Sequence, residues 1–316
     1  MTSGEGGTGR PALERMLEAR SVAVVGASVR EGSVGHQSLV ELVEGGFEGR
    51  VHPVNPKYDE VLGLPCLASI ADIGEPVDLA ILAVSNARLE EQLRLAALAG
   101  AGSAVIFASG YEEPRDDAPA LVDRLAAIAR EAGMAVCGGN GMGFANFELR
   151  VRALGFYEPK DVRPGGVTFL SHSGSAFSAV VQSRRHLGLN LAVSAGQELV
   201  TSVADYMRYA LELESTKVVG LFLETVRDPP GFVEALRLAG ERDVPVVALK
   251  VGREAFARQM VAAHSGALAG EDGAYEAIFD AHGVSRVESL DELADTLSLF
   301  AAGRRAGPGG LASVHD

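Results

Sequence analysis

Tryptophan is absent from this chain, and both aromatic residues and cysteine are scarce. Aromatics make up 6% of the 316 residues, so the core must be built mainly from Val, Ile, Leu and Ala, as in buried parallel sheets. Cys66 and Cys137, the only cysteines, exclude a disulfide framework, and we expect no metal site. No stretch reaches the roughly 18 uninterrupted apolar residues that a membrane-spanning helix requires, so no membrane association is expected.

Positive charge is also scarce. The chain has 28 Lys and Arg against 42 Asp and Glu, and its net charge of −14 argues against general binding to nucleic acid or to anionic membranes. An acidic protein can still bind an anion locally, through the backbone N–H groups at a helix N-terminus. Residues 1–10 are rich in Gly, Ser and Thr and lack the apolar run of a signal peptide, which indicates a disordered arm and a cytoplasmic protein.

Apolar runs of strand length alternate with helical patterns along most of the chain. This alternation predicts an α/β fold with doubly wound parallel sheets, and the length suggests two domains. The expected strands are residues 21–25, 51–54, 77–84, 103–108 and 134–137, then 167–170, 191–194, 218–223, 244–249 and 284–287. The expected divisions are an arm at 1–10, a first domain at 11–145, a second at 146–302, and at 303–316 a linker with the start of a further unit.

A phosphate-binding turn is predicted where the first strand ends. Gly26, Ser28 and Gly35 lie between that strand and a helix, and such a turn presents backbone N–H groups to phosphate. It lacks the second glycine of the dinucleotide pattern G-x-G-x-x-G. Lys57 follows the second strand, where a dinucleotide site needs an acid for the ribose. The pattern therefore disfavours NAD and favours a ligand with an extra phosphate, unless Lys57 is an ordinary solvated loop lysine.

Small residues also end the third and fourth strands. Ala83-Val84-Ser85 follows one strand and Ala108-Ser109 follows the other. Ligands of open α/β sheets bind outside these carboxyl ends, and small side chains leave room there for a long, thin ligand. Ser85 and Ser109 are equally consistent with plain helix caps.

In the second domain, three features follow strands that a parallel sheet would end on one edge. Ser171-His172-Ser173-Gly174-Ser175 opens a helix, and its N–H groups and hydroxyls indicate an anion site. Glu224 ends a strand, and His264 lies in the small-residue stretch 262–270 after another. An imidazole oriented by a carboxylate beside a phosphate site can accept a phosphoryl group. We therefore interpret His264 as a nucleophile and Glu224 as its partner.

Each of these interpretations has an alternative. His264 is also consistent with a helix end beside a glycine-rich turn, and Glu224 with an acid in a surface salt bridge. His172 is a rival nucleophile, although its place just before the helix suits lining a phosphate site better than carrying a phosphoryl group.

These motifs resemble the α-type half of the NDP-forming acyl-CoA synthetases, the superfamily of succinyl-CoA synthetase and ADP-forming acetyl-CoA synthetase. The resemblance runs from about residue 13 to residue 300. It rests on residues 171–174, on residues 250–253 and above all on residues 264–270, which match the family's phosphohistidine segment. It implies a Rossmann-like CoA-binding domain followed by a flavodoxin-like parallel CoA-ligase domain.

The resemblance also implies roles for single residues. His264 would be transiently phosphorylated with Glu224 beside it, and Ser171, Ser173, Gly174 and Ser175 would hold phosphate. The CoA-contacting loops would contain Ser28, Pro56, Lys57, Ser85 and Ser109. Asn140 matches the Asn of the family's G-P-N-C stretch. The chain departs from the family there, with glycines around Asn140, and again with Gln197-Glu198 after Gly196, where relatives often have Gly-Asn. Both departures concern the acyl pocket.

The function implied is formation of acyl-CoA from a small carboxylic acid, CoA and ATP, or the reverse, through an acyl phosphate and a phosphohistidine. Neither a G-x-x-x-x-G-K-[ST] loop nor the family's ATP-grasp domain is recognisable. We therefore expect ATP or ADP and Mg²⁺ on a partner domain or chain of an oligomeric enzyme. The alternatives are a non-catalytic CoA- or acyl-CoA-binding module, the CoA-binding part of a protein lysine acyltransferase, and an NAD-dependent dehydrogenase.

Overall fold

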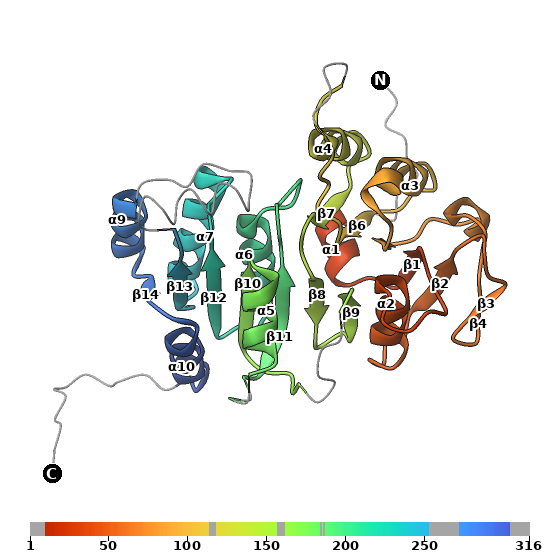
Figure 1. Ribbon diagram of the computed structural model, residues 1–316. Helices are drawn as coiled ribbons and strands as arrows, with labels where there is room; N and C mark the ends of the chain where they lie inside the picture. The colour runs from red at the N-terminus through yellow and green to blue at the C-terminus, as the bar shows by residue number, and fades with distance from the viewer. Residues whose placement is uncertain are drawn as a thin grey trace, which may run out of the picture.

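The computed structural model describes residues 10–113, 118–156, 162–183, 185, 187–252 and 272–303. These residues form two large sheets side by side, each covered by helices (Figure 1), and the predicted α/β class is confirmed. The arm expected at the N-terminus and the unit expected after 303 fall outside the described residues, apart from their boundary residues Arg10 and Gly303. None of the described helices is both long enough and apolar enough to span a membrane.

The first sheet is wholly parallel, in the order β2-β1-β5-β6-β7. Its strands are Ser21–Val25 (β1), Arg50–Val54 (β2), Leu79–Leu82 (β5), Ser103–Ile106 (β6) and Ala135–Gly138 (β7). Its helices are Ala12–Leu17 (α1), Val34–Val43 (α2), Asn86–Leu98 (α3) and Leu121–Glu131 (α4). A hairpin of Glu60–Val61 (β3) and Leu64–Pro65 (β4) and a 3-10 turn, Ile70–Ile73 (η1), follow β2.

Strand β1 shows why this sheet needs aliphatic residues. Successive side chains of a strand point to opposite faces. Val22 and Val24 pack in the same core as helices α1 and α2, whereas Ala23 and Val25 pack in the core formed with α3 and α4. All five residues of β1 are buried, so both faces require apolar side chains.

The second sheet is mixed, in the order β14-β13-β12-β10-β11-β8-β9. Its strands are Gly143–Asn146 (β8), Val151–Leu154 (β9), Val167–Ser171 (β10), Leu189–Ser194 (β11), Val218–Leu223 (β12), Val246–Lys250 (β13) and Ser285–Val287 (β14). Its helices are Gly174–Val181 (α5), Val203–Glu212 (α6), Pro229–Glu241 (α7), Asp272–His282 (α9) and Leu290–Ala301 (α10).

The prediction of a wholly parallel second sheet was wrong at one edge. Strands β8 and β9 were not predicted, and β8 pairs antiparallel with β11. The chain leaves β7 through the glycine-rich stretch 139–142 and enters the second sheet as β8, which runs antiparallel to the neighbouring strand β11. The boundary expected between residues 145 and 146 therefore falls inside β8, which pairs with the second sheet.

The parallel strands of the two sheets share one topology. In each sheet the first strand lies between the second and the third, so that successive connections leave in opposite directions. This creates a switch point between β1 and β5 in the first sheet and between β10 and β12 in the second. Ligands of open α/β sheets bind at the carboxyl ends of the strands at such points.

One hydrophobic core extends through both sheets. It includes Met16 and Leu39 from the first domain and Phe144 and Val193 from the second. A buried ion pair crosses the same interface, where Arg152 of β9 donates from Nε to Glu41 Oε2 of α2 over 2.8 Å. The two switch points are therefore held in a fixed relation to each other.

Removing one partner of this pair should be costly. Arg152→Met leaves Glu41 buried without its cation, and we expect the free energy of unfolding to fall by about 3 kcal/mol, measured by urea denaturation. Arg50→Met, which breaks an exposed pair with Glu75, should cost less than about 1 kcal/mol. Equal losses in the two variants would contradict a structural role for the buried pair.

Candidate active site

A cavity of about 720 Å³ opens at the carboxyl ends of β1 and β5, at the first switch point. Most of the residues predicted for the cofactor line it, namely Gly26, Ser28, Gly35, Lys57, Ala83, Val84, Ser85 and Ala108. The residues predicted from the sequence therefore surround a cavity, and the size of this cavity suits a ligand longer than a single nucleotide base.

The turn at the mouth of this cavity requires its glycines. Gly26 has φ of +92°, and a Cβ there would lie 2.3 Å from the carbonyl oxygen of Ala83. A Cβ on Gly35 would lie 1.9 Å from the carbonyl oxygen of Gly26. Helix α2 begins immediately behind the turn, capped by Ser33, whose hydroxyl accepts from the N–H of His36 over 3.4 Å. The helix start can thus present N–H groups to an anion in the cavity.

Three exposed cations surround the cavity. Lys57 was predicted, but Arg30 and Arg88 were not. Asn55 holds the loop that carries Lys57, since its amide donates to the carbonyl of Ala27 over 2.7 Å and accepts from the N–H of Lys57 over 3.1 Å. In the sequence, Arg88 has the appearance of a polar-face residue of α3, so only the fold shows that it points toward a ligand site.

Three predicted residues lie beside this cavity rather than in its lining. Pro56 lines a smaller adjoining cavity. The hydroxyl of Ser109 accepts from the N–H of Tyr111 over 3.3 Å, and Asn140 lies in the glycine-rich stretch after β7. Ser85 occupies the N-cap position of α3, but its side chain makes no capping hydrogen bond, so the helix-cap alternative does not explain it.

The predicted phosphate loop follows β10 at the second switch point. Ser173 caps helix α5, its hydroxyl accepting from the N–H of Ala176 over 3.3 Å. The hydroxyl of Ser171 closes the loop by donating to the Ser173 carbonyl over 2.7 Å and accepting from the Ser173 N–H over 3.1 Å. Ser175 is exposed at the helix start. Ser171 and Ser173 thus shape the loop, and the N–H groups of the first turn of α5 remain for an anion.

His172 is engaged through both ring nitrogens. Its Nδ1 accepts from the backbone N–H of Glu224 over 3.1 Å, so the proton is on Nε2, which donates to Glu198 Oε1 over 3.0 Å. The side chain is buried, with 5% of the residue exposed. His172 therefore connects the phosphate loop to the end of β12, and this arrangement argues against its use as a nucleophile.

Glu198 is a residue that the sequence pattern marked only as a departure from the family. It is buried, and its carboxylate also accepts from the N–H of Val203, the first residue of α6, over 2.5 Å. A carboxylate at a helix start is favoured by the helix dipole. Glu198 thus joins α6 to His172 and, through it, to Glu224.

Glu224 is buried directly after β12, with 7% of the residue exposed, so the alternative of a surface salt-bridge acid is wrong. Lys250 ends the next strand, β13, and is buried with its Nζ 4.7 Å from the ring of Tyr275. Burial lowers the pKa of the Lys250 amine, and the nearby carboxylates of Asp272 and Glu224 oppose that shift. The predicted nucleophile, His264, lies outside the described residues.

The segment after β7 connects the carboxyl edges of the two sheets. The N–H of Asn140 donates to the carbonyl of Ala108, which follows β6 in the first sheet, over 3.0 Å. The N–H of Met142 donates to the hydroxyl of Ser194 at the end of β11 over 3.0 Å. A Cβ on Gly174 would lie 2.9 Å from Met142 Cγ, so the phosphate loop approaches this segment closely. A ligand in the first cavity and an anion at α5 would therefore adjoin each other across residues 138–142.

Comparison with known families bears on the interpretations that the sequence left open. A model described as "CoA binding domain" matches residues 20–146, and one described as "Succinyl-CoA ligase like flavodoxin domain" matches residues 164–300. The chain belongs to the superfamily of NDP-forming acyl-CoA synthetases. The resemblance seen in its motifs is thereby confirmed, and its two domains are those of the α-type half of this superfamily.

Members of the superfamily match nearly the whole chain. A trans-feruloyl-CoA synthase from an unknown prokaryotic organism is 35% identical over 308 residues, which are 96% of this chain and 43% of the relative. An ADP-forming acetate–CoA ligase of Methanocaldococcus jannaschii is 33% identical over 285 residues, which are 89% of this chain and 39% of the relative. The chain thus spans less than half the length of these curated relatives.

A solved superfamily structure has the same fold. The dinucleotide-forming acetyl-coenzyme A synthetase 1 of Ca. Korarchaeum cryptofilum, in complex with phosphate and ADP, matches with a TM-score of 0.83 at 29% identity. The match covers 92% of this chain and 62% of that one.

Replacing Lys57, one of the exposed cations around the first cavity, tests whether the ligand bound there is an anion. Lys57→Glu should weaken CoA binding at least tenfold, about 1.4 kcal/mol, because it replaces attraction to phosphate by repulsion. The loss should shrink at high salt, since exposed charges are screened. Isothermal titration measures both effects.

Lys217→Glu is the matched control. Lys217 is exposed directly before β12, and its replacement by Glu changes the net charge by the same amount as Lys57→Glu. If both variants weaken CoA equally, the effect comes from net charge and Lys57 does not belong to the site.

Proposed function

We propose that this chain is the acyl- and phosphoryl-transferring part of an acid–CoA ligase. It interconverts a CoA thioester and phosphate with CoA and an acyl phosphate, and then passes the phosphoryl group to His264. The observation that carries the proposal is the buried Glu224 at the second switch point, whose backbone N–H is held next to the predicted phosphate loop by His172.

The first step joins the two sites. CoA occupies the 720 Å³ cavity, and phosphate binds at the N-terminus of α5, where N–H groups and the helix dipole favour an anion. A phosphate oxygen attacks the thioester carbonyl, the C–S bond breaks, and CoA leaves as a thiolate that takes up a proton. The product is an acyl phosphate held between the two sites.

The second step uses His264. Its neutral imidazole attacks phosphorus, a P–N bond forms, the P–O bond to the acyl group breaks, and the acid leaves as a carboxylate. Glu224 accepts a hydrogen bond from the other ring nitrogen and stabilises the positive charge that develops on the ring. His172 and Glu198 act as positioning residues, because they fix the backbone N–H of Glu224.

The nucleotide step requires groups from elsewhere. We propose that phosphorylated His264 transfers its phosphoryl group to ADP, with Mg²⁺, on an ATP-grasp domain or subunit in the cytoplasm. The length of the relatives supports this division, because the match covers only 43% of the feruloyl-CoA synthase. The names of the relatives favour a carboxylic acid as the substrate, and aliphatic and aromatic acids are both candidates.

A non-catalytic CoA-binding module is the main competing function. Such a module needs a cavity for CoA, but it needs neither a buried acid after β12 nor a histidine that links the backbone of that acid to the phosphate loop. An NAD-dependent dehydrogenase is disfavoured by the CoA-binding family match. The CoA-binding part of a lysine acyltransferase would share the CoA cavity, but the chemistry proposed for His264 would be dispensable.

Replacing the nucleophile should remove the covalent intermediate. His264→Ala should abolish acid-labile ³²P on the chain after incubation with ³²P-labelled acyl phosphates, because no P–N bond can form at that position. His282→Ala, in the last turn of α9, is the control for loss of a histidine and should label normally. Normal labelling of His264→Ala would refute the proposed acceptor.

Neutralising the buried carboxylate should act on rate more than on folding. Glu224→Gln should slow labelling by acyl phosphate at least tenfold in a rapid-quench time course, since an amide cannot stabilise an imidazolium as a carboxylate does. Glu241→Gln, an exposed acid paired with Arg237, is the control and should have no effect. An unchanged rate in Glu224→Gln would remove Glu224 from the transfer step.

A further inference from the structure

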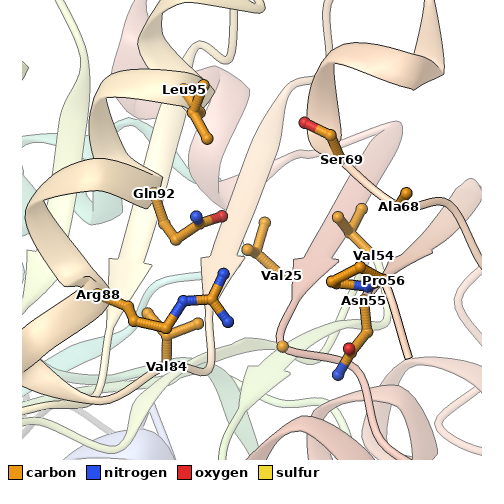
Figure 2. A pocket seen from close by; sticks show the side chains of 11 residues that line it. Val25, Val54, Asn55, Pro56, Ala68, Ser69, Val84, Arg88, Gln92 and Leu95 are labelled. Atoms are coloured by element: carbon orange, nitrogen blue, oxygen red, sulfur yellow. The ribbon is translucent and has the colours of Figure 1, made fainter. Parts of the chain in front are cut away.

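The first cavity has a charged end and an aromatic end. The cations Lys57, Arg30 and Arg88 lie in the segments that follow β2, β1 and β5. Arg88 and Asn55 lie on opposite sides of the smaller adjoining cavity (Figure 2), and both also line the first cavity. The described part of the lining that follows β6, the next strand of the sheet, is apolar and includes Phe107. A ligand with phosphates at one end would therefore place an apolar group at the other.

Two phenylalanine rings form the aromatic end. Phe107 follows β6 of the first sheet, and Phe156 follows β9 of the second sheet. Their ring centroids lie 6.4 Å apart and their planes meet at 83°, which makes them an edge-to-face pair. Phe156 remains 43% exposed although it lines the cavity. A ligand that covers this ring would therefore remove apolar surface from water and gain affinity.

Two glycines hold the Phe107 ring in place. A Cβ on Gly143 would lie 3.2 Å from Phe107 Cε1, and a Cβ on Gly155 would lie 3.1 Å from the same atom. Gly143 also has φ of +90°, a conformation that favours glycine. The Phe107 ring thus packs directly against the backbone at both positions, and a ligand meets an aromatic surface that is already fixed.

The aromatic end adjoins the predicted phosphate loop. Phe107 packs against Gly143, and the preceding residue, Met142, lies against the start of α5. A Cβ on Gly174, the first residue of that helix, would lie 2.9 Å from Met142 Cγ. A group that is bound against Phe107 and joined to a carbonyl carbon can therefore present that carbon to an anion at the N-terminus of α5, as the proposed acyl transfer requires.

We propose that Phe107 and Phe156 bind the acyl group of the substrate and select a carboxylic acid that carries an aromatic ring. The inference rests on the proposed function and chooses between the aliphatic and aromatic acids left open there. An aromatic ring can stack on the pair or meet it edge to face, which adds affinity beyond the area that the ring buries. A saturated ring of the same size lacks that interaction, and a two-carbon acyl group is too small to cover both rings.

The test measures ring selectivity by isothermal titration with the 316-residue chain in phosphate-free buffer, so that no acyl transfer occurs. The ligands are CoA, acetyl-CoA, benzoyl-CoA and 3-phenylpropanoyl-CoA, together with the cyclohexyl counterparts of the two aryl thioesters. At least one aryl thioester should bind roughly tenfold or more tightly than acetyl-CoA, because its ring removes apolar surface from water. The same thioester should bind about three- to tenfold more tightly than its cyclohexyl counterpart, because only an aromatic ring interacts with the pair.

Two variants complete the design. Phe156→Leu keeps an apolar side chain but removes one ring of the pair. It should abolish the preference over the cyclohexyl thioester and leave the affinity for CoA unchanged, which also shows that the variant is folded. Tyr111→Leu is the matched control, because Tyr111 is a 64% exposed aromatic residue after β6 that is not among the described residues lining the cavity. This control should keep every preference of the wild type.

The outcomes separate this inference from the proposed function. If the wild type binds CoA but neither aryl thioester is preferred over acetyl-CoA and over its cyclohexyl counterpart, selection of an aromatic ring is overturned and the proposed function stands. A preference that survives in Phe156→Leu overturns the role of the pair. Weaker binding of CoA itself by Phe156→Leu also overturns the inference, because the ring then contacts CoA and not the acyl group. If the wild type does not bind CoA, the proposed function fails, and the inference fails with it.

Discussion

The continuous aliphatic core that runs through both sheets is the constraint on which the site depends. Each sheet alone would create one ligand-binding edge at its own switch point. Because Met16, Leu39, Phe144 and Val193 belong to one packed cluster, the two edges cannot move independently. The segment 138–142 then connects the two sheets, because its N–H groups donate to the carbonyl of Ala108 after β6 and to the hydroxyl of Ser194 at the end of β11. A ligand reaching from one edge to the other meets a prearranged site, and prearrangement of reacting groups lowers an activation barrier.

The charged side chains at the carboxyl edge of the second sheet are buried. Glu224 and Lys250 both end central strands and are almost fully buried, and they lie close enough for the carboxylate to affect the pKa of the amine. Charges in such a dry environment interact more strongly than in water. The His172–Glu198 pair fixes the backbone beside Glu224. Two histidines follow strands of this sheet because they have different roles. His172 positions the backbone, whereas His264 is the predicted nucleophile.

Much of the fold could be predicted from local pattern, because buried parallel strands appear as apolar runs that end in Gly, Ser or Asn. The turn at Gly26 and the loop at Ser171 were found in this way. The antiparallel strands β8 and β9 were missed, since their residues carry no long apolar run and their pairing depends on a distant edge of β11. Arg88 was missed because a polar residue in a helix gives no sign in the sequence that it faces a cavity. Glu198 appeared only as a departure from a family pattern, and its partner His172 is 26 residues away.

The central claim is that the two edges act on one acyl group. The most direct test incubates the chain with ³²P-phosphate and a panel of aliphatic and aromatic acyl-CoA thioesters, and follows free CoA by chromatography together with acid-labile label on the protein. The account predicts that one thioester releases CoA only when phosphate is present, and that peptide mapping finds the label on His264. CoA release that is independent of phosphate, or label on another residue, would contradict it.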